Sequence, residues 1–268
     1  MHALSLHHLS VMDLSPAELI DTAAGLGCAY VCLFTFQPGS AVSMPLVHDG
    51  DVAPLRRQLC DAGVSVLGTT SFALEADTDI ASYEAGVERS AGLGAQHANC
   101  RITDPDEARV IDHFGRFAEF CVQRGLVPLI EPSGYRNTDA QPQALRIIAK
   151  VGHGGLTLDP LHITRTGTSW EEVEALDPAL IGYVQICDGP ADATAEEYFR
   201  EGAYRRLPPG EGVYPLDRLL GVTPKGMPLS VEIPCQRLRD EGLAGRELAT
   251  EIIRRTRAWL EAQDSASS

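Results

Sequence analysis

The sequence has no apolar run near the roughly 20 residues that a helix needs to cross a bilayer, so we expect no membrane span. Its first residues, MHALSLHHLS, lack the basic stretch and apolar core of a signal peptide, which favours a cytoplasmic location. Basic residues are also scarce, with 22 Lys and Arg against 37 Asp and Glu and a formal charge of −15. A field of that sign repels phosphate backbones, so nucleic acid is excluded as an expected partner.

Paired cysteine motifs are missing as well. There are seven cysteines, an odd number, and no CxxC pair, which argues against a zinc ribbon or a disulfide scaffold. Most of them lie in apolar stretches and are expected to be reduced core thiols: Cys28, Cys32, Cys60, Cys100 and Cys121.

Eight short apolar segments recur along the 268 residues and predict strands. They are 3–9, 30–34, 64–72, 96–102, 127–131, 155–159, 181–187 and 229–233. Stretches of helical periodicity separate most of them, and strands that alternate with helices are typical of parallel βαβ units. We therefore predict a single (β/α)₈ TIM barrel over residues 1–262, followed by a disordered tail at 263–268. A doubly wound sheet is disfavoured because no GxGxxG turn is present.

Local signals mark where the helices begin and end. Ser15-Pro16-Ala17-Glu18 is a capping box with proline at the first helical position, and similar starts are expected at Asp104 to Glu107 and at Ser169 to Glu172. Glycines are expected to end four helices: Gly63, Gly94, Gly125 and Gly152. A long excursion at 188–212, rich in Gly, Pro, Asp and Glu, follows the seventh strand, and long loops of this kind usually cover a barrel's active site.

Polar residues stand at the carboxyl ends of the last four predicted strands. They are Glu131, Asp159, Gln185 and Glu232, and alternation along each strand allows all four to point inward. Buried carboxylates need a compensating cation or hydrogen bonds, and an oxygen-only set suits Mg²⁺ or Mn²⁺. The sequence therefore predicts a metal site at the barrel mouth. The alternative is that these residues cap the following helices or pair with arginines.

These residues resemble those of the xylose-isomerase-like barrels of the sugar phosphate isomerase/epimerase group, and the resemblance covers nearly the whole chain. Ketose 3-epimerases of that group hold a metal with Glu, Asp, His and Glu at the ends of strands five to eight. Glu131, Asp159 and Glu232 match three of those positions, while Gln185 replaces the histidine. Asp159-Pro160-Leu161-His162 matches the DxxH motif, whose histidine lies beside the substrate.

A second match lies in the long excursion. Arg206-Leu207-Pro208-Pro209-Gly210-Glu211-Gly212 resembles the RxxPGxG segment whose arginine contacts the substrate. It comes later in the chain than in those epimerases because of the insertion ADATAEEYFREGAY, which we expect to reshape the pocket mouth. The other interpretation of Arg206 is a solvated loop residue.

The resemblance implies a divalent-metal-dependent isomerase or epimerase of a small polyhydroxylated ketone, acting through a metal-stabilised enediolate with Glu131 and Glu232 as acid and base. His162 and Arg206 are candidate substrate-binding residues, and one of His7 and His8 is expected to face the pocket. A metal-dependent lyase fits the same residues: an inosose or dehydroshikimate dehydratase-like enzyme, or one that β-eliminates an oxidised glycoside.

Two further alternatives are weaker. A non-catalytic subunit is disfavoured by the intact acid pair, and a DNA-cutting zinc enzyme of the same superfold would need several site histidines and a basic face. Members of the family often form dimers or tetramers, so a homo-oligomer is compatible with the sequence. Asp188 is expected to orient a ligand or cap the loop, and Trp170, Tyr198 and Tyr204 to be packing residues.

Overall fold

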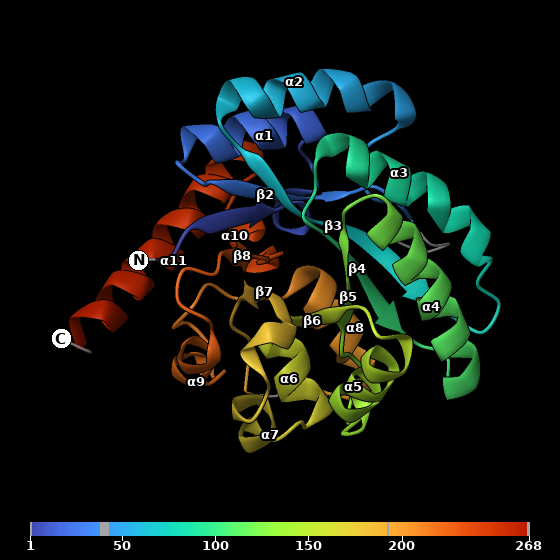
Figure 1. Cartoon of the computed structure of the whole chain (residues 1–268). Coiled ribbons are helices and arrows are strands. Elements are labelled where there is room, and N and C mark those ends of the chain that lie inside the picture. The colour runs from blue at the N-terminus through green and yellow to red at the C-terminus, as the bar shows by residue number, and fades with distance from the viewer. Residues whose placement is uncertain (1, 38–42, 192, 267–268) are drawn as a thin grey trace.

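The computed structural model describes residues 2–37, 43–191 and 193–266. Its eight strands are parallel and close into one barrel in chain order, with β1 paired to β8 (Figure 1). The strands are β1 Leu4–His7, β2 Tyr30–Phe34, β3 Ser65–Leu74, β4 His97–Ile102, β5 Val127–Glu131, β6 Gly155–Leu158, β7 Ile181–Ile186 and β8 Leu229–Val231. The predicted single TIM barrel is confirmed, and all eight expected strands are present with small differences at their ends.

Helices surround the strands. They are α1 Pro16–Gly25, α2 Val52–Ala62, α3 Tyr83–Leu93, α4 Glu107–Gln123, α5 Ala140–Val151, α6 Pro160–Thr166, α7 Trp170–Glu174, α8 Ala195–Tyr204, α9 Leu216–Val222, α10 Gln236–Asp240 and α11 Gly245–Ala266. Short 3-10 turns include η1 His8–Val11, directly after β1. Among the described residues no helix combines the length and apolar character that a membrane crossing requires.

Most of the predicted helix signals act as expected. Ser15 and Ser169 each form a capping box at the start of α1 and α7. The start expected at Asp104 is wrong by two residues, since Asp106 caps α4 by accepting from two backbone amides. Asp104 instead accepts from the Arg109 guanidinium, because a helix beginning at Glu107 turns Arg109 back towards the preceding loop.

Two apolar layers hold the barrel together. Cys32, Leu67, Leu129 and Tyr183 form the cluster inside it, and a much larger cluster lies between the strands and the helices. The inner layer leaves no room for a side chain at Gly68, where a Cβ would lie 3.0 Å from the Tyr183 ring. Side chains therefore fill the interior of the barrel, and an open site can form only at the ends of the strands.

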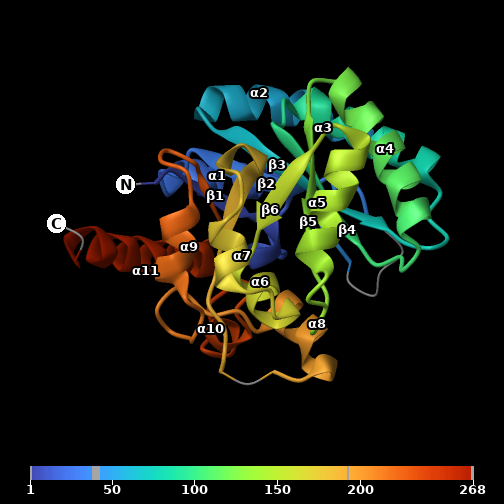
Figure 2. The ribbon, with the colours of Figure 1, turned by 60° about the horizontal axis from the view of Figure 1, so that its bottom comes forward.

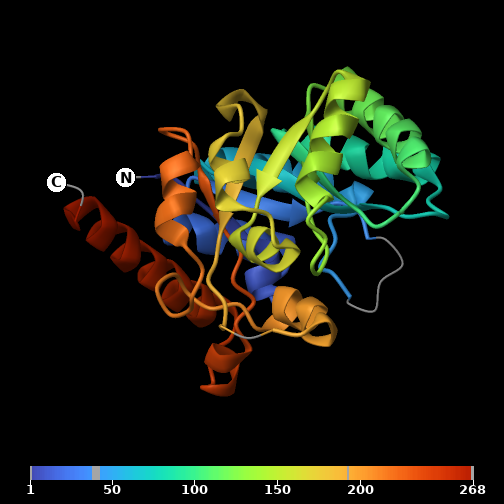
Figure 3. The ribbon, with the colours of Figure 1, turned by 90° about the horizontal axis from the view of Figure 1, so that it is seen from below.

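Two expectations about the periphery are corrected. All seven cysteines are free, but Cys60 is exposed rather than in the core, because α2 buries Leu55 and Leu59 on its opposite face. The tail predicted to be disordered from residue 263 is helical through Ala266, where Ser265 donates back to the Glu261 carbonyl. Residues 267–268 lie outside the described residues. Both ends of the chain lie on the same side of the molecule (Figure 3).

The excursion after β7 contains a helix. α8 lies with α6 and α10 at one end of the barrel (Figure 2), and Thr194 caps it by accepting from the Glu197 amide. Hydrogen bonds of Glu201 hold α8 in place. Glu201 accepts two from Arg165 of α6, at 2.8 and 2.6 Å, and one from Tyr214 at 2.6 Å. This buried network holds α8 over the carboxyl ends of the strands.

Candidate active site

A pocket of ≈ 700 Å³ opens at the carboxyl ends of the strands. Glu131, His162, Arg206 and Glu232, all expected from the sequence, line it. The α8 cover contributes Tyr198 and the largely exposed Phe199. This location, above the packed interior, is where active sites of TIM barrels are built.

Asp159 and His162 owe their positions to the start of α6. Asp159 is the residue before the helix and accepts from the Leu161 amide at 2.8 Å, while Pro160 occupies the first turn. One turn later, His162 Nε2 lies 3.8 Å from Asp159 Oδ2 and 3.7 Å from Glu131 Oε2. The three residues offer ligand atoms that all lie within 4.8 Å of one another. The DxxH spacing thus brings an imidazole and two carboxylates together.

Tyr198 is a site residue that the sequence analysis treated as packing. Its hydroxyl lies 2.6 Å from His162 Nδ1 and accepts from the Gly134 amide at 2.9 Å. Burial raises the pKa of Tyr198, so the phenol remains protonated. A phenol can donate to Nδ1 or accept from it, and it therefore supports either tautomer of His162. The helical pattern of residues 195–204 is visible in the sequence. It does not show which face of that helix packs against α6.

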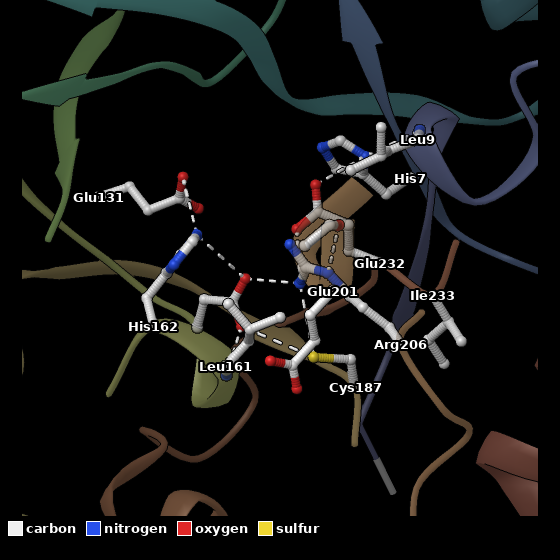
Figure 4. Close-up of polar contacts among 12 residues, drawn as sticks. His7, Leu9, Glu131, Leu161, His162, Cys187, Glu201, Arg206, Glu232 and Ile233 are labelled. Carbon is white, nitrogen blue, oxygen red and sulfur yellow. Dashed lines mark hydrogen bonds and ion pairs between the residues drawn. The ribbon is translucent and has the colours of Figure 1, made fainter. Parts of the chain in front are cut away.

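Glu232 lies across the pocket from Glu131 and is almost fully buried (Figure 4). Burial raises its pKa to about 8, against the opposing charge of Arg206, with Asp159 and Glu131 adding to the rise. At neutral pH the folded protein therefore keeps this carboxyl mostly protonated.

His7 meets the site through Glu232, with Nδ1 3.4 Å from Oε1. The same nitrogen accepts from the Leu9 amide, and burial lowers the pKa of His7 to about 3, so the ring is neutral. His8 faces away: it stacks on Phe34 and its Nε2 lies 2.8 Å from the Leu14 carbonyl oxygen. Of the two candidates, His7 is the one at the site, although neither lines the pocket.

Arg206 lies between two of the predicted metal ligands (Figure 4). Its Nη1 is 2.6 Å from Asp159 Oδ2 and 3.1 Å from Glu232 Oε2, and its Nε donates to the Gly202 carbonyl. The side chain is 3% exposed, so its interpretation as a solvated loop residue is wrong. Although burial opposes ionisation, Arg206 holds the pKa of Asp159 below its usual value. The guanidinium thus supplies compensating charge to these carboxyl groups, as the alternative of pairing with arginines expected.

Gln185 is buried on the interior face of β7, beside Ser230 in the strand register, but does not line the pocket. Its Oε1 has no hydrogen-bond partner among the described residues. Asp188, three residues later, caps the loop, accepting from the amides of Gly210, Gly212 and Tyr214. That network holds the segment containing Arg206 against the end of β7.

The donors present fit a divalent cation. Carboxylates and an imidazole within 4.8 Å of one another suit such an ion. Gln185 Oε1 and Glu232 Oε2 add two buried oxygens without a hydrogen-bond partner, since the 3.1 Å contact of Glu232 with Arg206 lacks hydrogen-bond geometry. The clustered set is Glu131, Asp159 and His162, whereas the predicted four-residue oxygen set stays a prediction.

The chain matches the model of a family described as xylose isomerase-like TIM barrel over residues 20–263. Among solved structures, the IolI protein with a bound zinc atom has a TM-score of 0.74 at 16% identity, over 96% of each chain. A xylose isomerase domain-containing protein from Salmonella typhimurium LT2 has a TM-score of 0.74 at 18% identity, over 96% of this chain and 97% of that one.

D-allulose 3-epimerase from Methylomonas sp., in complex with D-allulose, has a TM-score of 0.68 at 15% identity, over 97% of this chain and 96% of that one. At these identities the structures establish a shared fold. Among curated proteins, none matches the chain.

Proposed function

The chain belongs to the xylose isomerase-like TIM barrel family, and on that basis we propose that it is a divalent-metal-dependent isomerase or epimerase of a small polyhydroxylated ketone, a sugar or sugar-like molecule. The observation that carries this proposal is that Glu131 and Glu232 line one pocket together with His162, which lies within 3.8 Å of two carboxylates. The allulose complex of a structural neighbour is in keeping with a carbohydrate-like substrate.

Glu131, Asp159 and His162 would hold the cation, with Gln185 and Glu232 as further oxygen donors. When bound, the ion would supply a Lewis acid that makes a proton next to a carbonyl more acidic. We propose Mn²⁺ or Mg²⁺, because carboxylate and amide oxygens dominate the donors. The zinc-bound neighbour makes Zn²⁺ the comparison that any metal assay must include.

The two glutamates lie on opposite sides of the pocket, and this suits them to opposite roles. With its pKa raised to about 8 in the metal-free protein, Glu232 can hold a proton at neutral pH while it is not bound to the ion, and it can deliver that proton to one face of the substrate. Glu131 would accept the α-carbon proton on the other face. Removal on one side and return on the other inverts the carbon, which is epimerisation. Return to the neighbouring carbon gives isomerisation instead.

A lyase is the second candidate, and the raised pKa of Glu232 favours keeping it. A protonated buried carboxyl can donate to a departing β-hydroxyl as well as to carbon. Such an enzyme would dehydrate an inosose-like or dehydroshikimate-like substrate, or β-eliminate an oxidised glycoside.

The proposal is tested by measuring metal content and proton exchange together. Protein purified without chelator is analysed for Mn, Mg and Zn, beside Glu131→Gln and Glu232→Gln. Each protein is then incubated with ketoses in D₂O. We expect α-proton exchange in wild type that chelation abolishes and both substitutions suppress, with ultraviolet absorbance building up only if the enzyme is a lyase. Metal-independent exchange, or none with any ketose, would refute the proposal.

The cytoplasmic location also stays a proposal, supported by seven free cysteines, and cell fractionation tests it. Homo-oligomer formation is a prediction from the family resemblance, which light scattering after size-exclusion chromatography decides.

A further inference from the structure

One arginine in the pocket has no partner among the residues that the structure describes. Arg101 lines the pocket at the end of β4, and among the described residues it forms no ion pair or hydrogen bond. Its Nε is buried without a hydrogen-bond partner. An unpaired, half-buried guanidinium is unfavourable unless something else compensates its charge and satisfies its donors. Arg206, the other arginine lining the pocket, is bound to two carboxylates.

The strand register directs Arg101 towards the reacting groups. β4 and β5 place Arg101 opposite Glu131, and Asn99 opposite Leu129 of the inner cluster. Side chains two residues apart on a strand share a face, so Arg101 points to the barrel mouth beside Glu131. The two do not form an ion pair, and the Glu131 carboxylate instead lies 3.7 Å from His162 Nε2.

The other acids at this edge of the pocket are already neutralised. Asp104 accepts from Arg109 at 2.5 and 2.7 Å, and Asp139 lies 2.8 Å from Arg146. Neither forms an ion pair or a hydrogen bond with Arg101. In a chain with a formal charge of −15, a cation left unpaired inside the pocket is therefore a local feature and not part of a basic surface.

We propose that Arg101 binds an anionic group of the substrate, a carboxylate or a phosphate, on the β4 side of the pocket. The planar guanidinium offers paired N–H donors that match the oxygens of either group. This assignment rests on the proposed function only for the role of Glu131, beside which the anion would lie. The substrate class becomes an acidic sugar, a hydroxy-keto acid or a phosphorylated ketose.

The test compares three probes with one common ring. Calorimetric titration of the full chain as purified, with D-glucuronate, D-glucose 6-phosphate and D-glucose, separates carboxylate, phosphate and neutral ligands. We expect at least one anionic probe to bind wild type about tenfold or more tightly than glucose. Arg101→Gln should abolish that preference. Arg57→Gln should leave it intact, because it removes an exposed arginine of α2 that forms no ion pair or hydrogen bond within the described ranges.

Arg101→Lys keeps the charge but not the paired donors, so it should weaken the preference, and it provides the test if Arg101→Gln does not fold. Equal or absent binding of the three probes by wild type, or an anion preference that survives in the Arg101 variants, would overturn the assignment. A preference lost in Arg57→Gln as well would reduce it to a long-range charge effect.

The outcomes for the two proposals are separable. Anion preference that depends on Arg101 while no ketose exchanges protons would refute the proposed reaction and leave the anion site. Metal-dependent exchange without any effect of Arg101 on binding would do the reverse.

Discussion

Replacing Arg206 by methionine tests whether its guanidinium compensates the buried carboxyl groups of Asp159 and Glu232. Asp159 has a side chain exposed by 0% and Glu232 by 7%, and Arg206 Nη1 contacts both. Removing one partner of a buried ion pair costs about 3–5 kcal/mol, because the remaining charge stays desolvated. We expect a loss of that size in the free energy of unfolding of metal-free Arg206→Met at about pH 7.5.

The pH dependence has a definite sign. Arg206 lowers the folded-state pKa of Asp159 below 3.8, so the stabilisation is complete above that value and disappears as the pH falls through the folded-state pKa. Without Arg206, burial raises the pKa of Asp159, and each unit is worth about 1.4 kcal/mol. Because the variant can protonate Asp159, its deficit should shrink by about 1–2 kcal/mol between pH 7.5 and pH 5.

Urea unfolding of chelator-treated protein at both pH values measures this deficit, with Arg200→Met as the control because Arg200 is an exposed residue of α8. Added Mn²⁺ should stabilise Arg206→Met more than wild type, since ion and guanidinium neutralise the same carboxylates. A deficit under about 1 kcal/mol, or one that is equal at the two pH values, would show that Arg206 does not compensate this pair. Equal stabilisation of both proteins by Mn²⁺ would show that ion and arginine act independently.

Three further predictions follow from single contacts. Glu232→Gln should make the free energy of unfolding less dependent on pH between pH 5 and about 8. In the wild type the pKa of this carboxyl is raised from 4.5 to about 8, so its stabilising contribution is lost as the pH rises through that window. Urea unfolding across the pH range measures the slope, and a slope equal to that of the wild type would contradict the prediction. Tyr198→Phe removes the hydroxyl that lies 2.6 Å from His162 Nδ1. It should weaken Mn²⁺ binding by about 10–100-fold in calorimetry. Tyr204→Phe, at the end of the same helix, should leave Mn²⁺ binding unchanged. Glu201→Gln leaves Arg165 without its carboxylate and should cost about 3 kcal/mol in urea unfolding, and a loss no larger than that of Glu196→Gln would show that this pair does not anchor α8.

Much of the fold could be predicted because its signals are local. Strand-length apolar segments, the capping boxes at Ser15 and Ser169 and the left-handed glycines at Gly63 and Gly94 each act within a few residues, and all appear as expected. The misplaced start at Asp104 also has a local cause: two candidate caps stand two residues apart, and because the helix begins after the second, Asp104 accepts from Arg109 instead.

The site was only partly predictable. DxxH spacing on a helix brings Asp159 and His162 together on one face, and the strand ends bring in Glu131 and Glu232. Tyr198 could not be assigned, because its role depends on how the insertion packs and not on its own helix. That Gln185 does not line the pocket likewise depends on its depth in the barrel, which alternation along a strand does not specify.

The sequence by itself determined the eight-unit barrel and which strand ends carry acids, because periodicity and capping are properties of neighbouring residues. Only the tertiary structure decided what compensates those acids. Arg206 and Asp159 are 47 residues apart, and their contact exists because Glu201 and Arg165 anchor α8 and Asp188 holds the loop that follows. Burial then makes that contact necessary, since neither charge retains water to stabilise it.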